Sequence, residues 1–340
     1  MRAGLFVVWL LVTLFAPPVL AQGDSDAIRQ RVEALKPAEF PTQPIELVVP
    51  TAPGGGLDVA ARLLARAAEK YMSQKIFVAN RVGAGGLVAY TWLATQAPNN
   101  GSVIGLVSNS VLGDSLLRAG GKWTYKDIEP VVFLNHEPAA WIVSTKSPFK
   151  DKSFADIIAQ AKSEPQKINI GSMAQTVYEF LAEQIETATG AQFTKVPFQG
   201  SAPALISLLG GHIDVSFGYL ADYRAYLASG DIKPIVVSGA KRSPFLPNVP
   251  TVNEVLGTTT IVRNVFRFIG APKGMPASHR AYLMAGLSAA IADAEFIEET
   301  NKVGAIMDPS LDTPEKISAE LDKMAVLERN FLIASNRLKP

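Results

Sequence analysis

Residues 48–58 read Val48-Val49-Pro50-Thr51-Ala52-Pro53-Gly54-Gly55-Gly56-Leu57-Asp58, and they join a predicted strand to a predicted helix. A short β-branched run stops at a proline, three glycines follow, and the Leu and Ala spacing from Val59 to Tyr71 is typical of a helix. Glycines allow a sharp turn and a close approach of the backbone to a ligand. They also leave free N–H groups at a helix N-terminus, where the dipole favours an anion. The alternative is a tight strand-to-helix turn with Asp58 in the first helical turn.

The composition narrows the class of protein. The chain has 340 residues with ordinary apolar and charged fractions, so it can bury large cores and form two domains. A formal net charge of +1, without blocks of like charge, argues against a nucleic-acid-binding protein. Cysteine is absent, which excludes disulfides, thiolate zinc sites, iron–sulfur clusters and a cysteine nucleophile.

The N-terminus predicts export. Arg2 precedes an apolar run from Ala3 to about Leu14, and helix-breaking prolines and the small-residue ending Val19-Leu20-Ala21 follow. This pattern is typical of a secretory signal peptide over residues 1–21, cleaved after Ala21, which would place the mature protein in the periplasm. The alternative is an uncleaved membrane anchor, because the stretch from Ala3 to Leu20 is close to the lower length limit for a span. No later segment is long and apolar enough to cross a bilayer.

The body of the chain alternates strand-like and helix-like patterns, which predicts an α/β fold with mostly parallel sheets. Residues 22–43 form a leader with a short amphipathic helix, and the body starts at Pro44. The expected strands are Ile45–Val49, Ile76–Ala79, Val103–Val107, Val131–Phe133, Ala140–Ser144, Ile168–Ile170, Phe193–Pro197, Val215–Gly218, Ile235–Val237 and Phe266–Gly270. Helix starts are predicted at Ser153, with Asp156 three residues on, and at Thr313-Pro314.

Several strand-to-helix junctions are built from small residues. They are Asn80 to Gly86 before the predicted helix Leu87–Thr95, Ser108-Asn109-Ser110, Gly171 to Thr176 before Val177–Thr189, and Phe198 to Pro203 before Ala204–Leu209. In open α/β sheets, ligands bind outside the carboxyl ends of strands, where such loops gather. Loops of two facing domains would make an anion cleft lined by backbone N–H groups and small hydroxyls. The pattern therefore predicts a binding site without an obvious reactive group.

Longer motifs resemble the Bug family, the periplasmic receptors of tripartite tricarboxylate transporters. In the first half they are Val48-Val49-Pro50, Pro53 to Asp58, and Asn80-Arg81-Val82-Gly83-Ala84-Gly85-Gly86. In the second half, Val196 to Ala204 resembles the family's VPYKGSAPA segment, Leu209 to Val215 its LGGxxDV, and Ala240 to Val252 its AKRSPxLPDVPTV. The resemblance covers nearly all of the mature chain and stays in register throughout.

The resemblance implies a two-domain Venus-flytrap receptor of the type II binding-protein class. Lobe one would comprise residues 44–139 plus 240–340, and lobe two residues 140–239, with hinges near Asn135–Ala140 and Val237–Ala240. A monomer would trap a small carboxylate between the lobes and deliver it to inner-membrane transporter subunits. Closure of the lobes would exclude water and strengthen each charge–dipole contact.

The expected ligand-binding residues come from both lobes. They are Thr51, Pro53, Gly54, Gly55, Gly56, Asp58, Ser108, Gly171, Ser172, Gln175, Thr176, Phe198, Gly200, Ser201, Tyr219, Asp222 and Arg267. Asp58 is interpreted as orienting its loop through backbone bonds or contacting a ligand hydroxyl or amine. Arg267 can fork onto a carboxylate, or it can be an interdomain salt-bridge partner. Family members often carry a glycine-rich stretch with a histidine where this chain has Met173 to Tyr178, so the ligand stays open.

Rival functions fit less well. Gly83-Ala84-Gly85 does not complete a dinucleotide fingerprint, because Val88 occupies the next small position, and Gly54-Gly55-Gly56 lacks the Gly-Lys-Ser/Thr of a P-loop. The three histidines are far apart in sequence, and no Gly-x-Ser-x-Gly elbow is present. We therefore expect no catalytic residue, metal or cofactor. A receptor that signals to a membrane partner remains an alternative to transport. Citrate-like acids, aliphatic dicarboxylates, aromatic acids and acidic amino acids all remain candidate ligands, and residues 173–178 favour an apolar or aromatic body.

Overall fold

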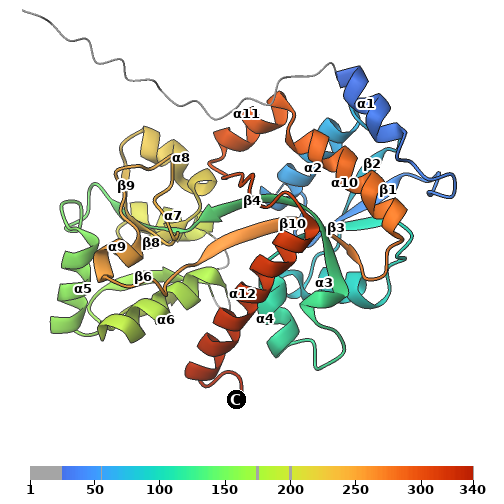
Figure 1. The fold of residues 1–340 in the computed structure, drawn as a ribbon. Coiled ribbons are helices and arrows are strands. Elements are labelled where there is room, and N and C mark those ends of the chain that lie inside the picture. The colour runs from blue at the N-terminus through green and yellow to red at the C-terminus, as the bar shows by residue number, and fades with distance from the viewer. Residues whose placement is uncertain (1–24, 55, 174–175, 199–200, 340) are drawn as a thin grey trace, which may run out of the picture.

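The computed structural model describes residues 25–54, 56–173, 176–198 and 201–339, and Figure 1 shows them as two lobes joined by long strands. The expected signal peptide lies outside the described residues, as does the start of the leader. The expected short leader helix is α1 (Ser25–Glu33). Among the described residues, no helix combines the length and apolarity needed to span a membrane.

Lobe one is built on a five-stranded sheet in the order β2 (Ile76–Asn80), β1 (Ile45–Val49), β3 (Val103–Ser108), β10 (Asn264–Pro272) and β4 (Ile128–Pro138). The pairs β2–β1 and β1–β3 are parallel, whereas β10 runs antiparallel to both β3 and β4. This sheet is therefore mixed, because β10 returns from lobe two and enters from the opposite end.

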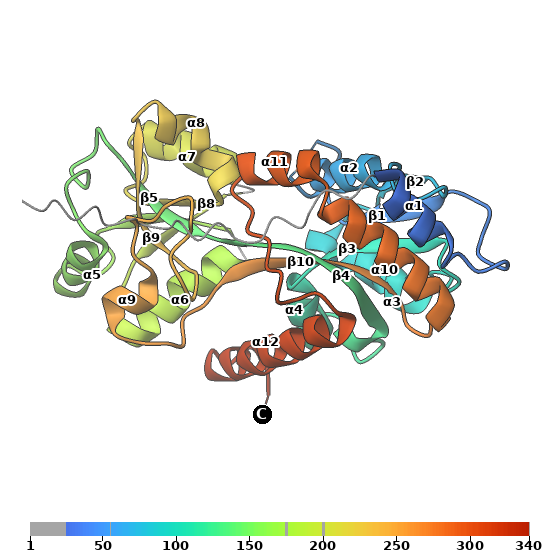
Figure 2. The same cartoon turned by 45° about the horizontal axis from the view of Figure 1, so that its top comes forward.

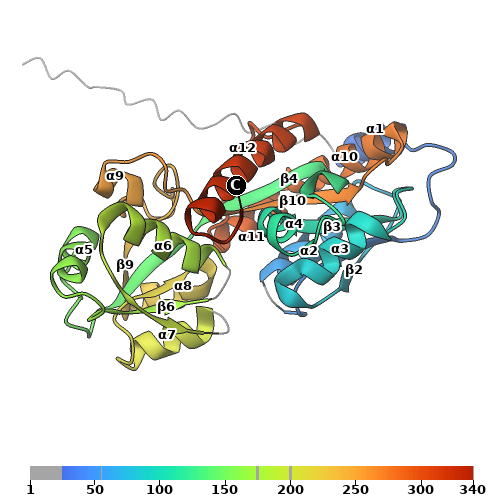
Figure 3. The ribbon, with the colours of Figure 1, turned by 90° about the horizontal axis from the view of Figure 1, so that it is seen from below.

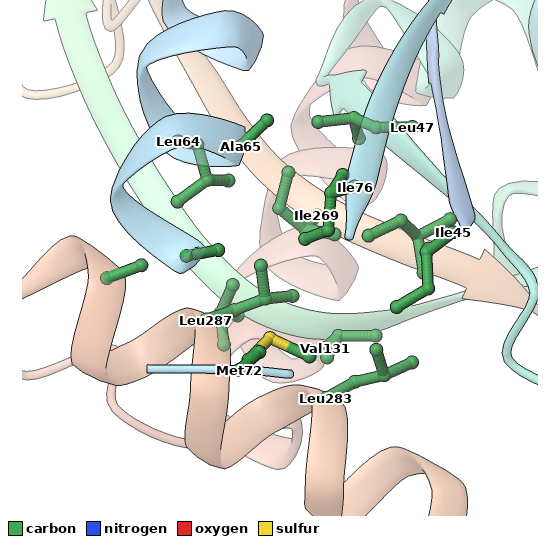
Figure 4. Packing of buried hydrophobic residues seen from close by; sticks show 14 of the residues in the cluster. Ile45, Leu47, Leu64, Ala65, Met72, Ile76, Val131, Ile269, Leu283 and Leu287 are labelled. Atoms are coloured by element: carbon green, nitrogen blue, oxygen red, sulfur yellow. The ribbon is translucent and has the colours of Figure 1, made fainter. Parts of the chain in front are cut away.

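Helices cover both faces of this sheet (Figure 2). Alternate residues of β1 point to opposite faces, as expected for a strand. Leu47 packs in a cluster with α2 (Gly56–Ala68) and α10 (Ala277–Ile291), whereas Val48 packs with α3 (Leu87–Thr95), α4 (Ser110–Leu117) and α12 (Pro314–Ala334). Figure 4 shows the first cluster, in which Leu64 of α2 and Leu283 and Leu287 of α10 close over the strands.

Lobe two also has a mixed sheet. β5 (Ala140–Ser144) lies between β8 (Ser216–Gly218) and β9 (Ile232–Val237) and is antiparallel to both. β6 (Asn169–Ser172) and β7 (Thr194–Pro197) form a parallel pair, and a parallel bridge from Ile170 to Val215 brings them beside β8. The helices are α5 (Phe154–Ser163), α6 (Val177–Thr189), α7 (Ser201–Leu209), α8 (Leu220–Ala228) and α9 (Val252–Leu256).

The chain crosses between the lobes where three segments meet. The Ala139 N–H donates to Ser238 Oγ at 2.9 Å, and the Ser238 N–H donates to the Ala139 carbonyl at 2.8 Å. The Arg263 N–H donates to the Ser238 carbonyl at 3.0 Å. Residues 245–261 lie on the far side of this junction, because Leu246, Val252 and Ile261 pack in the lobe-two clusters. We therefore propose that the return crossing lies at residues 262–264 and not at 237–240.

Within the described residues, a strand occurs at each expected position. β4 is far longer than Val131–Phe133, because it runs on as a buried strand to the lobe junction. The two predicted helix starts are confirmed: Ser153 and Asp156 form a capping box on α5, and Thr313 caps α12 with Pro314 at its first position. α11 (Ala294–Lys302) and the short 3-10 turns Ala84–Gly86 and Tyr125–Asp127 complete the described elements.

Candidate ligand-binding site

Asp58 fixes the loop between β1 and α2. Its carboxylate is buried and accepts hydrogen bonds from Arg62 Nε at 2.9 Å, from the Gly54 N–H at 2.9 Å and from Asn80 Nδ2 at 2.9 Å. The Arg62 bond, followed by the Gly54 bond, lowers the pKa of Asp58 to about 2. Of the two interpretations offered by the sequence, this geometry matches the one in which Asp58 orients its loop through backbone bonds.

The space in front of α2 is open. Gly54 has φ +81°, and a Cβ atom placed on Gly54 or on Gly56 would have no heavy atom within 4 Å. Both residues are exposed, as is Pro53. Gly56 begins the helix, and the N–H groups of a first helical turn have no partner inside the helix. The loop therefore leaves amide groups and a positive dipole end accessible to an anion. Gly55 lies outside the described residues.

Hydroxyl groups lie at the carboxyl ends of the neighbouring strands. Ser108 ends β3, and its Oγ lies 3.1 Å from the Tyr90 hydroxyl and 2.8 Å from Ser110 Oγ. The Thr51 carbonyl accepts Asn80 Nδ2 at 2.8 Å, but its buried Oγ1 has no hydrogen-bond partner among the described residues. These groups can donate to or accept from a ligand that reaches the β1–α2 loop.

In lobe two, backbone groups of Gly171 and its neighbours are already hydrogen-bonded within the fold. The Gly171 N–H donates to the Val215 carbonyl at 2.9 Å, and a Cβ there would lie 3.2 Å from the Phe217 ring. The Gly171 N–H is therefore already bonded within the fold, and a ligand contact by Gly171-Ser172 or Gly200-Ser201 stays a prediction. Ser172 is buried, and its carbonyl accepts the Phe198 N–H at 2.8 Å. Thr176 Oγ1 caps α6 by accepting the Tyr178 N–H at 3.3 Å. Gln175 and Gly200 lie outside the described residues.

Aromatic side chains surround these lobe-two loops. The Tyr178 and Phe217 rings stack with centroids 4.0 Å apart, and the Tyr219 ring lies 5.4 Å from Tyr178. Phe198 is half-buried and packs against the same cluster. The sequence analysis proposed Phe198 and Tyr219 as ligand contacts, and the structure brings them together.

Arg267 is held at the lobe junction. It lies on β10 opposite Ser108 of β3, and its Nη1 donates to Asn135 Oδ1 at 2.9 Å and to Glu137 Oε2 at 3.2 Å. The guanidinium lies 5.8 Å from the Tyr219 ring centroid. The ion pair joins the neighbouring strands β10 and β4 of one sheet, so Arg267 is a salt-bridge partner but not the interdomain one that the sequence analysis offered. Burial raises the pKa of the Glu137 carboxyl, although Arg267 opposes the shift.

Sequence reasoning missed Asn135 and Glu137. Both are buried on β4, and their two-residue spacing places them on one face of the strand. That spacing was the available signal, since two polar residues in a buried strand require partners.

Asp222 and Ser201 lie beside this junction. Asp222 accepts the Tyr219 N–H at 2.9 Å and a hydrogen bond from the Ser201 side chain. Asp222 is exposed, but the protein around its carboxyl removes part of its hydration, and this desolvation raises the pKa of the carboxyl. Among the described residues, no group of three or more His, Asp or Glu side chains is arranged to hold a metal ion.

The architecture, two α/β lobes joined by crossing strands with strand-end loops at the junction, is that of a periplasmic binding protein. Residues 60–319 match the model of the tripartite tricarboxylate transporter family receptor, and the chain belongs to this family. It is 29% identical over 301 residues to Protein BugT of Bordetella pertussis, with 85% of this chain and 90% of BugT covered.

Solved structures agree with this assignment. The periplasmic binding protein BugD superposes with a TM-score of 0.74 and 26% identity, covering 88% of this chain and 100% of BugD. Rpa4515 from R. palustris, solved with adipate, has a TM-score of 0.74 and 26% identity, covering 86% of this chain and 97% of Rpa4515. The two-lobed α/β fold expected from the sequence is confirmed.

Proposed function

We propose that this protein is a periplasmic solute-binding receptor that traps a small carboxylate between its lobes for a tripartite tricarboxylate transporter. The observation that carries the proposal is the open β1–α2 loop, where Gly54 and Gly56 leave space in front of a helix N-terminus. The adipate bound by the related Rpa4515 supports a carboxylate as the ligand class.

In this mechanism one ligand carboxylate lies on the first-turn N–H groups of α2, with hydroxyls such as Ser108 beside it. Each hydrogen bond to a charged group contributes about 1.5–3 kcal/mol, so a few suffice for micromolar affinity. Lobe two then closes over the ligand with Phe198, Ser201 and the Tyr219–Asp222 segment, by movement at the Ala139 and Arg263 crossings. The protein acts as an exported monomer without catalysis.

A thermal-shift screen tests the proposal. The mature protein, from Gln22, is screened against small carboxylates, each paired with its neutral amide. A ligand at about a hundred times its dissociation constant stabilises a protein by about 2.7 kcal/mol, which raises the melting temperature by a few degrees. A shift with an acid and none with its amide supports a carboxylate receptor. No shift with any acid, after unfolding and refolding to strip a carried ligand, contradicts it.

A further inference from the structure

The carboxyl ends of three neighbouring parallel strands in lobe two each lead to aromatic side chains. The β6–α6 junction supplies Tyr178, the β7–α7 junction supplies Phe198, and β8 and its junction supply Phe217 and Tyr219. The ends of β6, β7 and β8 share one edge because the β6–β7 pair and the Ile170–Val215 bridge are parallel. We refer to these four residues as the aromatic platform.

The aromatic platform is centred on a small cluster of its own, and Phe198 connects it to a larger core cluster of lobe two. Tyr178 and Phe217 are buried with Ala139 and Ala204 in a small cluster of their own, and Phe198 and Tyr219 pack on it while remaining half-buried. Ala139 is the residue at which the chain crosses between lobes. The half-buried residues Phe198 and Tyr219 therefore lie at the lobe junction, at the strand ends where ligands of open α/β sheets bind.

The charges beside the platform disfavour a second ligand carboxylate. Three charged groups gather at Tyr219: the Arg267 guanidinium lies 5.8 Å from its ring centroid, Asp222 accepts its N–H at 2.9 Å, and Glu137 pairs with Arg267. Arg267 is already paired with Glu137 at 3.2 Å, and the Glu137 carboxylate also accepts a backbone hydrogen bond from Ala221. The remaining accessible group is the Asp222 carboxylate, which accepts hydrogen bonds and repels another anion.

We propose that lobe two selects an aromatic carboxylate with a ring hydroxyl, whose ring stacks on the aromatic platform and whose hydroxyl donates to Asp222. This inference rests on the proposed function, because the ligand's own carboxylate is held by the β1–α2 loop of lobe one. The site thus has an anion-binding half in lobe one and an aromatic, acceptor-rich half in lobe two.

Calorimetric titration with four probes tests the inference on the full mature chain. The probes are 4-hydroxybenzoate, benzoate, cyclohexanecarboxylate, which has the bulk but no π-system, and adipate, which has two carboxylates. We expect 4-hydroxybenzoate to bind roughly 10-fold or more tightly than cyclohexanecarboxylate and adipate, from combined ring stacking and a charge-assisted hydrogen bond.

Two variants separate the contributions of the ring and the acid. Phe198→Leu keeps apolar bulk but removes a ring, so the affinity for 4-hydroxybenzoate should fall roughly 2- to 10-fold with little change for adipate. Phe77→Leu, on the exposed β2, is the matched control and should change neither affinity.

Asp222→Asn keeps a capping oxygen but removes the charge, so the preference for 4-hydroxybenzoate over benzoate should fall roughly 5- to 10-fold. Asp156→Asn makes the same change in the capping box of α5 and should leave the preference intact.

The outcomes distinguish the inference from the function on which it rests. Tighter binding of adipate than of 4-hydroxybenzoate would overturn the aromatic assignment and leave the carboxylate receptor standing. Equal affinities for 4-hydroxybenzoate and cyclohexanecarboxylate would also overturn it. Failure of every acid to bind the stripped and refolded protein would overturn the proposed function, and the inference with it.

Discussion

Asp58 accepts the backbone N–H of Gly54, four residues earlier in the chain, at 2.9 Å. An acid in the first turn of the helix thereby fixes the loop that precedes the helix. Arg62 covers the same carboxylate from the next turn at 2.9 Å, so its charge is compensated next to a candidate anion site. This arrangement explains how the motif tolerates an acid at the place where a ligand carboxylate is proposed to bind.

Replacement of Asp58 by Asn should lower stability in a pH-dependent way. The folded pKa of Asp58 is about 2, below its ordinary value of 3.8, so its contribution is complete above about pH 4 and is lost as the pH falls towards 2. We expect a cost of about 1–2 kcal/mol at pH 7, less than the full shift because the carboxylate lies just beneath the surface and is screened. Urea unfolding from pH 7 to pH 2.5 should show the two proteins converging. A constant difference would contradict this role.

Gly54→Ala should weaken ligand binding more than it weakens the fold. Gly54 has φ +81° and open space around the position of a Cβ, so the strain of a left-handed alanine costs about 1 kcal/mol without a clash. The new methyl group would stand where the ligand approaches the helix. Gly120→Ala is the matched control, with φ +59° and the same open surroundings outside the site. Equal ligand affinities of the Gly54→Ala and Gly120→Ala variants, measured by calorimetry, would contradict binding of the ligand at this loop.

The contact between α12 and α6 should tie the two lobes together (Figure 3). Arg263 donates to Gln184 Oε1 of α6 at 2.9 Å and to the buried Glu328 of α12, and its guanidinium lies 4.7 Å from the Phe331 ring centroid. Arg263→Ala leaves Glu328 buried without its partner and should cost about 3–5 kcal/mol in denaturant unfolding.

A paired replacement checks the cause of that loss. Arg263→Leu combined with Glu328→Leu should recover much of the stability, because no unpaired charge remains. The exposed pair of Arg242 and Glu254 is the control, and Arg242→Ala should cost at most about 1 kcal/mol. Additive effects of the two Leu substitutions would show that Arg263 and Glu328 are not coupled.

Glu137→Gln should change the pH dependence of stability in the opposite sense to Asp58→Asn. Burial raises the folded pKa of Glu137 above its ordinary value of 4.5, so ionisation destabilises the native protein as the pH rises through 4.5 and up to the folded pKa. The wild type should therefore lose stability relative to Glu137→Gln over that window. Unfolding measured from pH 4 to pH 8 checks the sign, and a rising relative stability of the wild type would contradict it.

The local elements were predictable from the sequence because their signals are local. The capping box of Ser153 and Asp156 and the proline after Thr313 mark helix starts within four residues. The full length of β4 was not predictable, since Asn135 and Glu137 interrupt its apolar pattern. Their partner Arg267 is distant in the sequence, so a short sequence window does not show that these polar residues can be buried in a strand. The lobe to which α9 belongs depends on tertiary packing, which no short window reports.

In the candidate site, too, the features with local sequence signals were predictable and those that depend on distant partners were not. The glycines at 54–56 predicted an open helix N-terminus, because glycine has no side chain to fill the space in front of the helix. The pairing of Arg267 with Glu137 joins residues 130 positions apart and requires the register of β10 on β4. The hydrogen bond from the Gly171 N–H to the Val215 carbonyl likewise depends on a neighbouring strand, so the sequence alone did not show that this N–H is occupied.

The most direct test of the receptor assignment is a calorimetric titration of the best acid from the thermal-shift screen, and of its amide, into the refolded mature protein. A one-site isotherm with a dissociation constant in the micromolar range or below for the acid, and no measurable heat of binding for the amide, is the predicted result. Equal affinity for the acid and the amide would contradict recognition of a carboxylate by the Gly54–Asp58 loop.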